Sequence, residues 1–180
     1  MTKARTPSRR VRGFSHAPLG LAAQNAVQIS RGATCELRRS QINDSWYEPG
    51  TDDPINEPTA TGVLFFDPGS PLLIEDCNFG NCQAGIYAFT FTTVTTNATF
   101  RRNRIHAAQY GVVMDSVSGA LIADNSIHVA SAGDIGDAFD DASPANVWTG
   151  NNFSSRTVAG PYAIDGGTAV DATAKPGVRG

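Results

Sequence analysis

Hydrophobic and polar positions along this chain repeat in a six-residue pattern. Each copy has a hydrophobic residue, two polar or small residues, a small residue, any residue and a second hydrophobic residue. The copies occupy residues 37–42, 74–79, 100–105, 122–127 and 148–153. Their fourth positions are Ser40, Cys77, Asn103, Asn125 and Asn151. The copies show no helical periodicity and predict short β-strands joined by turns.

A glycine follows the hexamer at a nearly constant distance. Gly85, Gly111 and Gly133 each lie eight residues after the fourth position of the preceding copy. With a degenerate copy near the N-terminus, the last hydrophobic residue of the copies recurs every 22 to 37 residues, at Phe14, Ile42, Phe79, Ile105, Ile127 and Phe153. Such a period, with short strands and glycines at corners, indicates a solenoid of stacked β-coils.

Stacking assigns a structural role to the fourth position of the hexamer. Coils of a β-solenoid lie about 4.8 Å apart, so equivalent side chains lie directly above one another. Asn103, Asn125 and Asn151 are expected to bond each other's amides and the turn backbone, with about 1 kcal/mol net from each bond. Ser40 and Cys77 are expected to extend this structural ladder with poorer partners.

The hexamers and the strands that follow the glycines resemble the repeats of the pectin-lyase-like superfamily over residues 12 to about 165. The resemblance implies an all-β fold, a right-handed single-stranded parallel β-helix of about six coils of roughly 22–28 residues. One coil has an insertion of about 14 residues within 43–61. That superfamily holds polysaccharide lyases, glycoside hydrolases, sugar epimerases, phage spikes and non-catalytic repeat proteins, so the resemblance implies a fold rather than one activity.

The domain organisation follows from the extent of the repeats. We predict a basic disordered tail over residues 1–11, the β-helix domain over 12–165 and a flexible C-terminal tail over 166–180. Exposed coil ends have unpaired strand edges, which predict end-to-end self-association.

Composition and charge change the partners that we expect. The chain has 14 basic and 17 acidic side chains, and five of the basic ones fall within residues 1–12, where no acid occurs. The rest of the chain is therefore acidic, which disfavours nucleic acid as a partner, although the basic segment offers contacts to phosphates. The 3 cysteines lack disulfide and metal-ligand spacing, so we expect free thiols.

The chain has no apolar run of membrane-spanning length, and its N-terminus lacks the apolar region of a signal peptide. We therefore expect no membrane partner. The protein is either cytoplasmic or a fragment of an exported protein, and in the second case its location is extracellular or at the cell surface.

The insertion within 43–61 is the first candidate for ligand binding. Trp46 and Tyr47 offer rings that stack on sugars, and Asp52 and Asp53 offer oxygens for hydroxyl groups or a cation. A surface loop without function is the alternative. A second acidic cluster over 134–141 lacks the spacing of a known calcium loop, so calcium is only a weak expectation and no other cofactor is expected.

His106 and His128 are candidate catalytic bases. Each lies three residues after a ladder asparagine, so they are expected to stack on adjacent coils. Two imidazoles in contact disfavour each other's protonation, which leaves neutral bases near pH 7. Arg104 is a candidate to neutralise a uronate carboxylate and so acidify the adjacent sugar proton. The alternative is that these residues only occupy turn positions of the repeat.

Asp115 and Asp137 form a second candidate pair. They lie four residues after Gly111 and Gly133, so the repeat predicts that they face each other on adjacent coils. Two carboxylates about 5 Å apart are the arrangement of a retaining glycosidase. The Asn-Thr-Asp and Gly-His-Gly motifs of polygalacturonase-like hydrolases and the calcium-binding aspartate group of the lyases are absent from this sequence.

Two functional hypotheses follow. The first is a secreted β-helix protein that binds or processes an extracellular polysaccharide, as a polysaccharide lyase or glycoside hydrolase if it is an enzyme. The second is a non-catalytic structural or surface-interaction module. Folded protein that neither binds nor turns over any glycan would favour the second.

Overall fold

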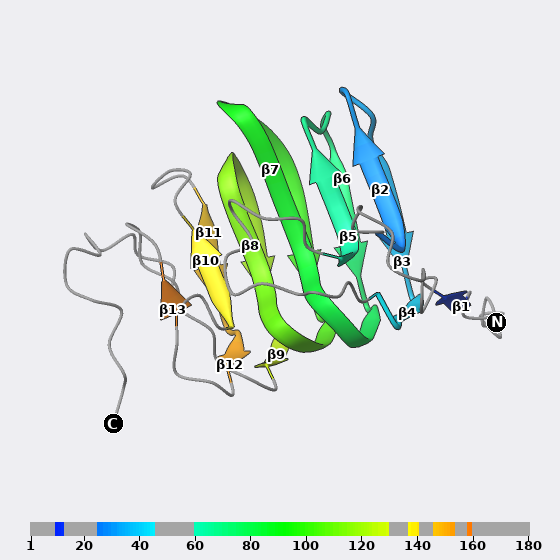
Figure 1. Cartoon of the computed structure of the whole chain (residues 1–180). Helices are drawn as coiled ribbons and strands as arrows, with labels where there is room; N and C mark the ends of the chain where they lie inside the picture. The colour runs from blue at the N-terminus through cyan, green and yellow to red at the C-terminus, as the bar shows by residue number, and fades with distance from the viewer. Residues whose placement is uncertain are drawn as a thin grey trace, which may run out of the picture.

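The chain winds into a stack of parallel β-strands (Figure 1). The computed structural model describes residues 10–12, 25–45, 60–129, 137–140, 146–153 and 158–159. Every strand pairing among these residues is parallel. The strands are β1 (Arg10–Arg12), β2 (Val27–Ser30), β3 (Cys35–Arg38), β4 (Gln41–Asn43), β5 (Thr61–Phe66), β6 (Leu72–Glu75), β7 (Asn78–Arg101), β8 (Arg104–Ala123), β9 (Ser126–Val129), β10 (Ala138–Asp140), β11 (Val147–Thr149), β12 (Asn152–Phe153) and β13 (Val158–Ala159).

The strands form three parallel sheets that run along the axis of the stack. Sheet I contains β2, β5, residues 84–89 of β7, residues 110–115 of β8, β10 and β13. Sheet II contains β3, β6, residues 94–101 of β7, residues 117–123 of β8 and β11. Sheet III contains β1, β4, residues 78–80 of β7, residues 104–107 of β8, β9 and β12.

Each coil therefore passes through sheets I, II and III in turn, and the long strands β7 and β8 bend through the corners between them (Figure 1). Because a strand that follows this path pairs in parallel with its equivalent in the next coil, the architecture is a parallel β-helix, as the repeat predicted. No described residue is helical, and the described part of the chain has no helix long and apolar enough to cross a membrane.

Alternate residues of every sheet point into one continuous core. Phe79, Ile105 and Ile127 stack in sheet III, and each is at most 1% exposed. Between sheets I and II, the rings of Phe65 and Phe100 stack with their centroids 5.5 Å apart. The second hydrophobic residue of the hexamer is thus the core position that the sequence predicted, because successive side chains of a strand alternate between its two sides.

Left-handed backbone turns the chain between sheets II and III. The residue before each ladder position has a positive φ, at Arg39 (48°), Asp76 (54°), Arg102 (53°), Asp124 (54°) and Gly150 (67°). Aspartate and glycine adopt this conformation more readily than other residues, whereas arginine pays a cost of about 1–2 kcal/mol. The ladder residue that follows supplies the hydrogen bonds that stabilise this corner.

Two predicted repeat positions are wrong. Val11, not Phe14, stands opposite Ile42, because the alternation of β1 places one apolar residue between two polar ones, as in β4. Asp137, not Gly133, stands opposite Gly111, since Val112 pairs with Ala138. The chain between β9 and β10 is longer than the corresponding part of the coil before it, and a surface loop absorbs such added residues at little cost.

The described residues include only some of the predicted domain limits. Strand β1 begins at Arg10, inside the segment predicted as a tail. Residues 1–9 and 160–180 lie outside the described residues, as do 46–59 of the predicted insertion.

Candidate functional site

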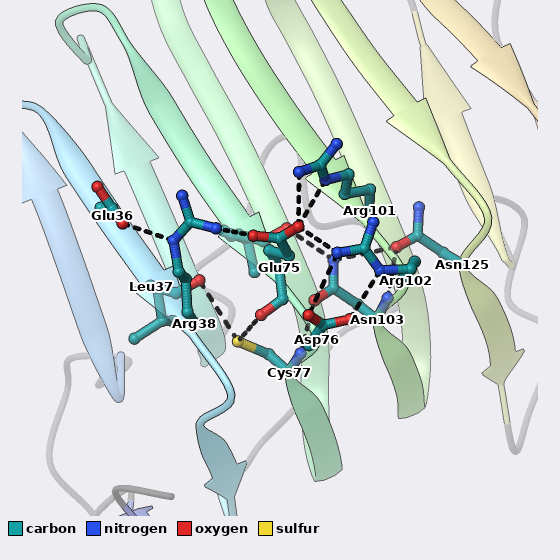
Figure 2. A network of polar contacts seen from close by, with 11 residues as sticks. Glu36, Leu37, Arg38, Glu75, Asp76, Cys77, Arg101, Arg102, Asn103 and Asn125 are labelled. Atoms are coloured by element: carbon teal, nitrogen blue, oxygen red, sulfur yellow. Dashed lines mark hydrogen bonds and ion pairs between the residues drawn. The ribbon is translucent and has the colours of Figure 1, made fainter. Parts of the chain in front are cut away.

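The fourth positions of the hexamer from Cys77 to Asn151 form a continuous hydrogen-bonded row, of which Figure 2 shows Cys77, Asn103 and Asn125. The Oδ1 of Asn125 accepts from the backbone N–H of Asn103 at 2.9 Å and from its Nδ2 at 3.0 Å. Asn151 accepts from Asn125 in the same way, at 3.0 and 2.9 Å. All three amides are buried and also donate to backbone carbonyls of the preceding coil, so their role is structural.

Cys77 takes the asparagine position one coil earlier and makes part of the same pattern. Its backbone N–H donates to Asn103 Oδ1 at 2.9 Å. Its Sγ donates to the carbonyls of Glu75 at 3.3 Å and Leu37 at 3.6 Å, and the second of these occupies the place of the amide donation of Asn103 to Ile74. The thiol therefore replaces the amide donor but offers a weaker acceptor to Ser40. Ser40 is buried, and its hydroxyl donates to the Arg38 carbonyl at 3.0 Å.

A buried carboxylate holds three arginines on the outer side of sheet II. The side chain of Glu75 is 4% exposed and accepts from Arg38 of the preceding coil and from Arg101 and Arg102 of the following coil (Figure 2). Arg101 reaches it through Nε at 2.7 Å and Nη2 at 2.6 Å. Arg102 also donates from Nε to Asp76 at 2.9 Å, and this bond lowers the pKa of Asp76.

These contacts compensate the charge of the Glu75 network internally. The arginines are paired with Glu75 and Asp76, and Arg38 additionally contacts Glu36. A buried carboxylate is tolerated when such partners satisfy it. The network therefore links coils and is no free cationic site.

The outer side of sheet III carries three of the predicted catalytic residues. Register places His106 opposite His128, and their rings stack with centroids 5.1 Å apart and planes inclined by 13°. Arg104 is two residues before His106 on the same strand, and all three side chains are exposed. The predicted stacking of the two histidines on adjacent coils is thus present in the structure.

Three causes favour the neutral imidazole at His106. Partial burial lowers its pKa, and the guanidinium of Arg104 and the imidazole of His128 lower it further. His106 can accept a proton or donate a hydrogen bond at the surface. A catalytic role would also require an acid or nucleophile within reach.

The predicted Asp115/Asp137 pair is wrong. Asp140 stands opposite Met114 and Asp137 lies next to Ala138, which pairs with Val112, so Asp115 and Asp137 are at opposite ends of the paired segment. The error follows from the longer chain before β10. Asp115 accepts from Tyr87 Oη at 3.4 Å and from Ser116 Oγ at 3.2 Å. Asp137 is fully buried and its carbonyl accepts from the Val112 amide at 3.1 Å.

An aromatic cluster on the outer side of sheet I was missed by the sequence reasoning. Phe66 and Phe89 stack with centroids 5.6 Å apart, and Phe91 contacts both edge to face at 5.5 and 5.1 Å. Phe91 is 77% exposed, whereas Phe66 and Phe89 are partly buried. Tyr87 lies beside Phe89 with centroids 6.2 Å apart.

The sequence holds a signal for this cluster. Tyr87, Phe89 and Phe91 recur with period two, and Ile86 before them and Ala88 between them belong to the core. The aromatic positions must therefore face outward. Phe66 joins them from the preceding coil, because it pairs with Phe89.

The structure also uses acidic residues in the interior near the end of the stack. Asp140 is 1% exposed and accepts from Asn146 Nδ2 at 3.0 Å and Trp148 Nε1 at 2.8 Å. Asn146 is buried too, and its Oδ1 accepts from the Ala120 amide at 2.9 Å. Asp140 therefore ties sheet I to sheet II, a structural role that the sequence reasoning did not assign.

The remaining predicted ligand-binding residues, Trp46, Tyr47, Asp52 and Asp53, lie outside the described residues. Within the described ranges, no group of three or more His, Cys, Asp or Glu side chains is arranged to hold a metal ion.

Comparison with known proteins agrees with the architecture. No curated protein and no solved structure matches the chain. The model of a protein family described as the right-handed β-helix region matches residues 14–171, which is most of the chain. The stacked parallel coils, the asparagine ladder and this match show that the chain belongs to the right-handed β-helix family.

Proposed function

We propose that this β-helix is a binding module that holds a polysaccharide on the aromatic cluster of sheet I. The observation that carries the proposal is the exposure of Phe91, at 77%, within a group of three mutually contacting rings. Large apolar side chains at the surface of a protein mark interaction sites when they cluster.

The chemistry of the cluster suits a sugar. The faces of aromatic rings pack against the apolar C–H faces of pyranose rings, while sugar hydroxyls remain in water or bond to polar neighbours. Phe66 and Phe89 come from paired strands of adjacent coils, and Phe91 follows Phe89 on β7. The rings are thus supported by a sheet, and binding orders few additional side chains.

The distribution of the other candidate residues favours binding over catalysis. Arg104, His106 and His128 lie on sheet III, whereas Asp115 lies on sheet I. Asp137 does not face Asp115, so the two-carboxylate arrangement of a glycosidase is not formed by this pair. A surface that needs only shape and stacking requires none of these groups to converge.

Substitution of Phe91 tests the proposal. Phe91→Ala should weaken binding to the glycan that the wild-type protein selects from a panel of neutral and acidic polysaccharides, by about tenfold, since loss of one stacked ring costs roughly 1.4 kcal/mol. Phe91→Trp should retain binding, because the indole preserves the stacking surface. Affinity is measured by isothermal titration calorimetry or affinity electrophoresis.

Val147→Ala is the matched control, because Val147 is also an exposed apolar residue, at 41%, but lies on sheet II. It should leave the affinity unchanged. Equal loss in both variants, or no binding of any glycan by protein with an intact β circular dichroism spectrum, would contradict the proposal and favour a purely structural module.

A further inference from the structure

We propose that the outer side of sheet III is a second binding face, which takes an acidic polysaccharide and binds it more tightly as the pH falls. This face is separate from the aromatic cluster, and its ligand is recognised by charge rather than by stacking. The inference therefore goes beyond the function proposed above.

Register defines two rows of positions on sheet III. The first row contains Arg10, Gln41, Asn78, Arg104, Ser126 and Asn152. The second row contains Arg12, Asn43, Gly80, His106 and His128. Between the rows lie the core residues Ile42, Phe79, Ile105 and Ile127, so the flanking positions of these coils face outward.

Part of the basic N-terminal segment pairs into sheet III. The pairing of β1 with β4 brings Arg10 into the row of Arg104, and Arg12 into the row of His106. The sequence reasoning placed these arginines in a tail or at its edge, in a basic segment that offers contacts to phosphates. Their register instead extends the positions of Arg104 and the histidines along the axis of the stack.

The described positions of the two rows include no carboxylate, although the chain as a whole has more acidic than basic side chains. The neighbouring charged groups lie at the corners of the sheet. Asp44 follows Asn43 at one corner and accepts from Asn81 Nδ2 at 3.1 Å. At the other corner Asp76 accepts a hydrogen bond from Arg102, and Asp124 occupies the equivalent position on the coil after that of Arg102.

Protonation of the histidine pair increases the positive charge of the face. The stacked rings of His106 and His128 are exposed, and the elements packed beside them present Arg104 and Ser126 from β8 and β9, Asn78 and Gly80 from β7 and Asn152 from β12. No group among these neutralises an imidazolium. A ligand anion lying across the two rings would do so.

The proton linkage has a definite sign. In the free protein partial burial is the largest cause of the lowered pKa of His106, and Arg104 and His128 lower that pKa further. A bound anion opposes the repulsion of these two groups and so raises that pKa again. Binding then takes up protons, so affinity increases as the pH falls through the range in which His106 is protonated, which in the free protein lies below the ordinary histidine range.

The spacing of the charges favours a glycan over a nucleic acid. Along the first row the cationic positions Arg10 and Arg104 are separated by two amide positions, and coils repeat about every 4.8 Å. A sulfated or carboxylated polysaccharide alternates acidic groups with hydroxyls that amides can bond. Duplex DNA has one charge per about 1.7 Å of its axis and few hydroxyls, and the acidic remainder of this chain repels so dense a charge.

The test compares dextran sulfate with uncharged dextran, because sulfate groups keep their charge over the whole range used. The protein should bind dextran sulfate about tenfold more tightly near pH 5.5 than near pH 8 at low ionic strength. Dextran should show no such change. Affinity is measured by biolayer interferometry with the glycan immobilised.

Two sets of variants locate the effect. His106→Gln/His128→Gln should remove most of the pH dependence, and Arg104→Gln should weaken binding at both pH values. Arg31→Gln removes the same charge from an exposed residue at the corner between β2 and β3, and it should behave as the wild-type protein. Phe91→Ala should leave dextran sulfate binding unchanged, which separates this face from the aromatic cluster.

Three results would overturn the proposal. The first is full pH dependence in the histidine double variant, which would show that carboxylates elsewhere cause it. The second is an equal loss of binding in Arg31→Gln and Arg104→Gln, which would show that only net charge matters. The third is binding of duplex DNA or of vesicles containing anionic lipid as tight as that of dextran sulfate in the same buffer, which would show that the face does not distinguish among polyanions.

Discussion

At the scale of the residue, one side chain per coil forms hydrogen bonds with the backbone groups of the turn between sheets II and III. Asn125 and Asn151 each accept two hydrogen bonds and Asn103 accepts one from Cys77, and each of the three donates one or more and is at most 9% exposed. A buried amide that lost its partner would cost about 1–3 kcal/mol. This row therefore fixes the corner geometry on which the outward rows of sheet III depend.

The thiol of Cys77 suggests a stabilising substitution in this row. Cys77→Asn should raise the free energy of unfolding by about 1 kcal/mol, because the new amide can accept from the Ser40 backbone N–H as Asn103 accepts from Cys77. Its Nδ2 should replace the weak thiol donation to the Leu37 carbonyl. Urea denaturation followed by circular dichroism measures the change.

Cys77→Ala is the control for this substitution, since it removes the thiol without adding an amide. It should be no more stable than the wild-type protein. If the asparagine variant were no more stable than the alanine variant, with the same dependence on urea, the ladder would not extend to this coil.

At the scale of the element, neighbouring coils approach too closely at one corner for any side chain. Gly62, Gly85 and Gly111 stand in one row where sheet I begins. A Cβ built on each would lie 2.8, 2.6 and 2.3 Å from the backbone carbonyl oxygen of the next coil, at Gly85, Gly111 and Asp137 respectively. The row of glycines is therefore a packing requirement of stacked strands rather than a flexible hinge.

Substitution at this row tests the packing. Gly111→Ala should lower the free energy of unfolding by about 3 kcal/mol, because the added methyl would also lie 2.2 Å from Ile127 Cγ2 and the backbone cannot move away. Gly80→Ala is the matched control, since its Cβ would meet only the side chain of Asn43, which can rotate. Similar losses for both variants, in thermal or urea denaturation, would be inconsistent with this explanation.

At the scale of the whole molecule, each coil of a solenoid contacts mainly its nearest neighbours, so the end coils, which have one neighbour, unfold more easily than the middle coils. Strands β2 and β3 pair with β5 and β6 on one side. The three thiols lie at different depths in this stack. Cys35 lies on β3 and is partly exposed, whereas Cys77 and Cys82 are buried in the following coil.

Thiol reactivity should report this gradient. Burial raises the pKa of all three thiols, in the case of Cys82 to about 11, so little reactive thiolate exists near pH 8. In native protein, a thiol reagent such as DTNB should modify Cys35 first and Cys82 only on global unfolding. Mass spectrometry of the labelled peptides identifies each site, and urea-unfolded protein provides the reference for three accessible thiols. Equal rates at Cys35 and Cys82 would show that the stack opens as one unit.

The sequence by itself determined the repeated parts of this protein. The hexamer predicted the core positions, the ladder at Asn103, Asn125 and Asn151, and the stacking of His106 on His128, because identical coils place equivalent residues one above another. These predictions needed only the period and the two-residue alternation of strands. They hold wherever the segment between two repeats keeps its length.

Only the tertiary structure decided what depends on loop length or on residues of different coils. The register of β10 places Asp137, not Gly133, opposite Gly111, and the register of β1 places Val11, not Phe14, opposite Ile42. The sequence could not predict this, because loops accept added residues without changing the strands they join. The Glu75 network and the cluster around Phe91 each combine side chains from two or three coils. Spacing along the chain places these residues in rows on adjacent coils, but which side chains make contact depends on side-chain directions across the stack.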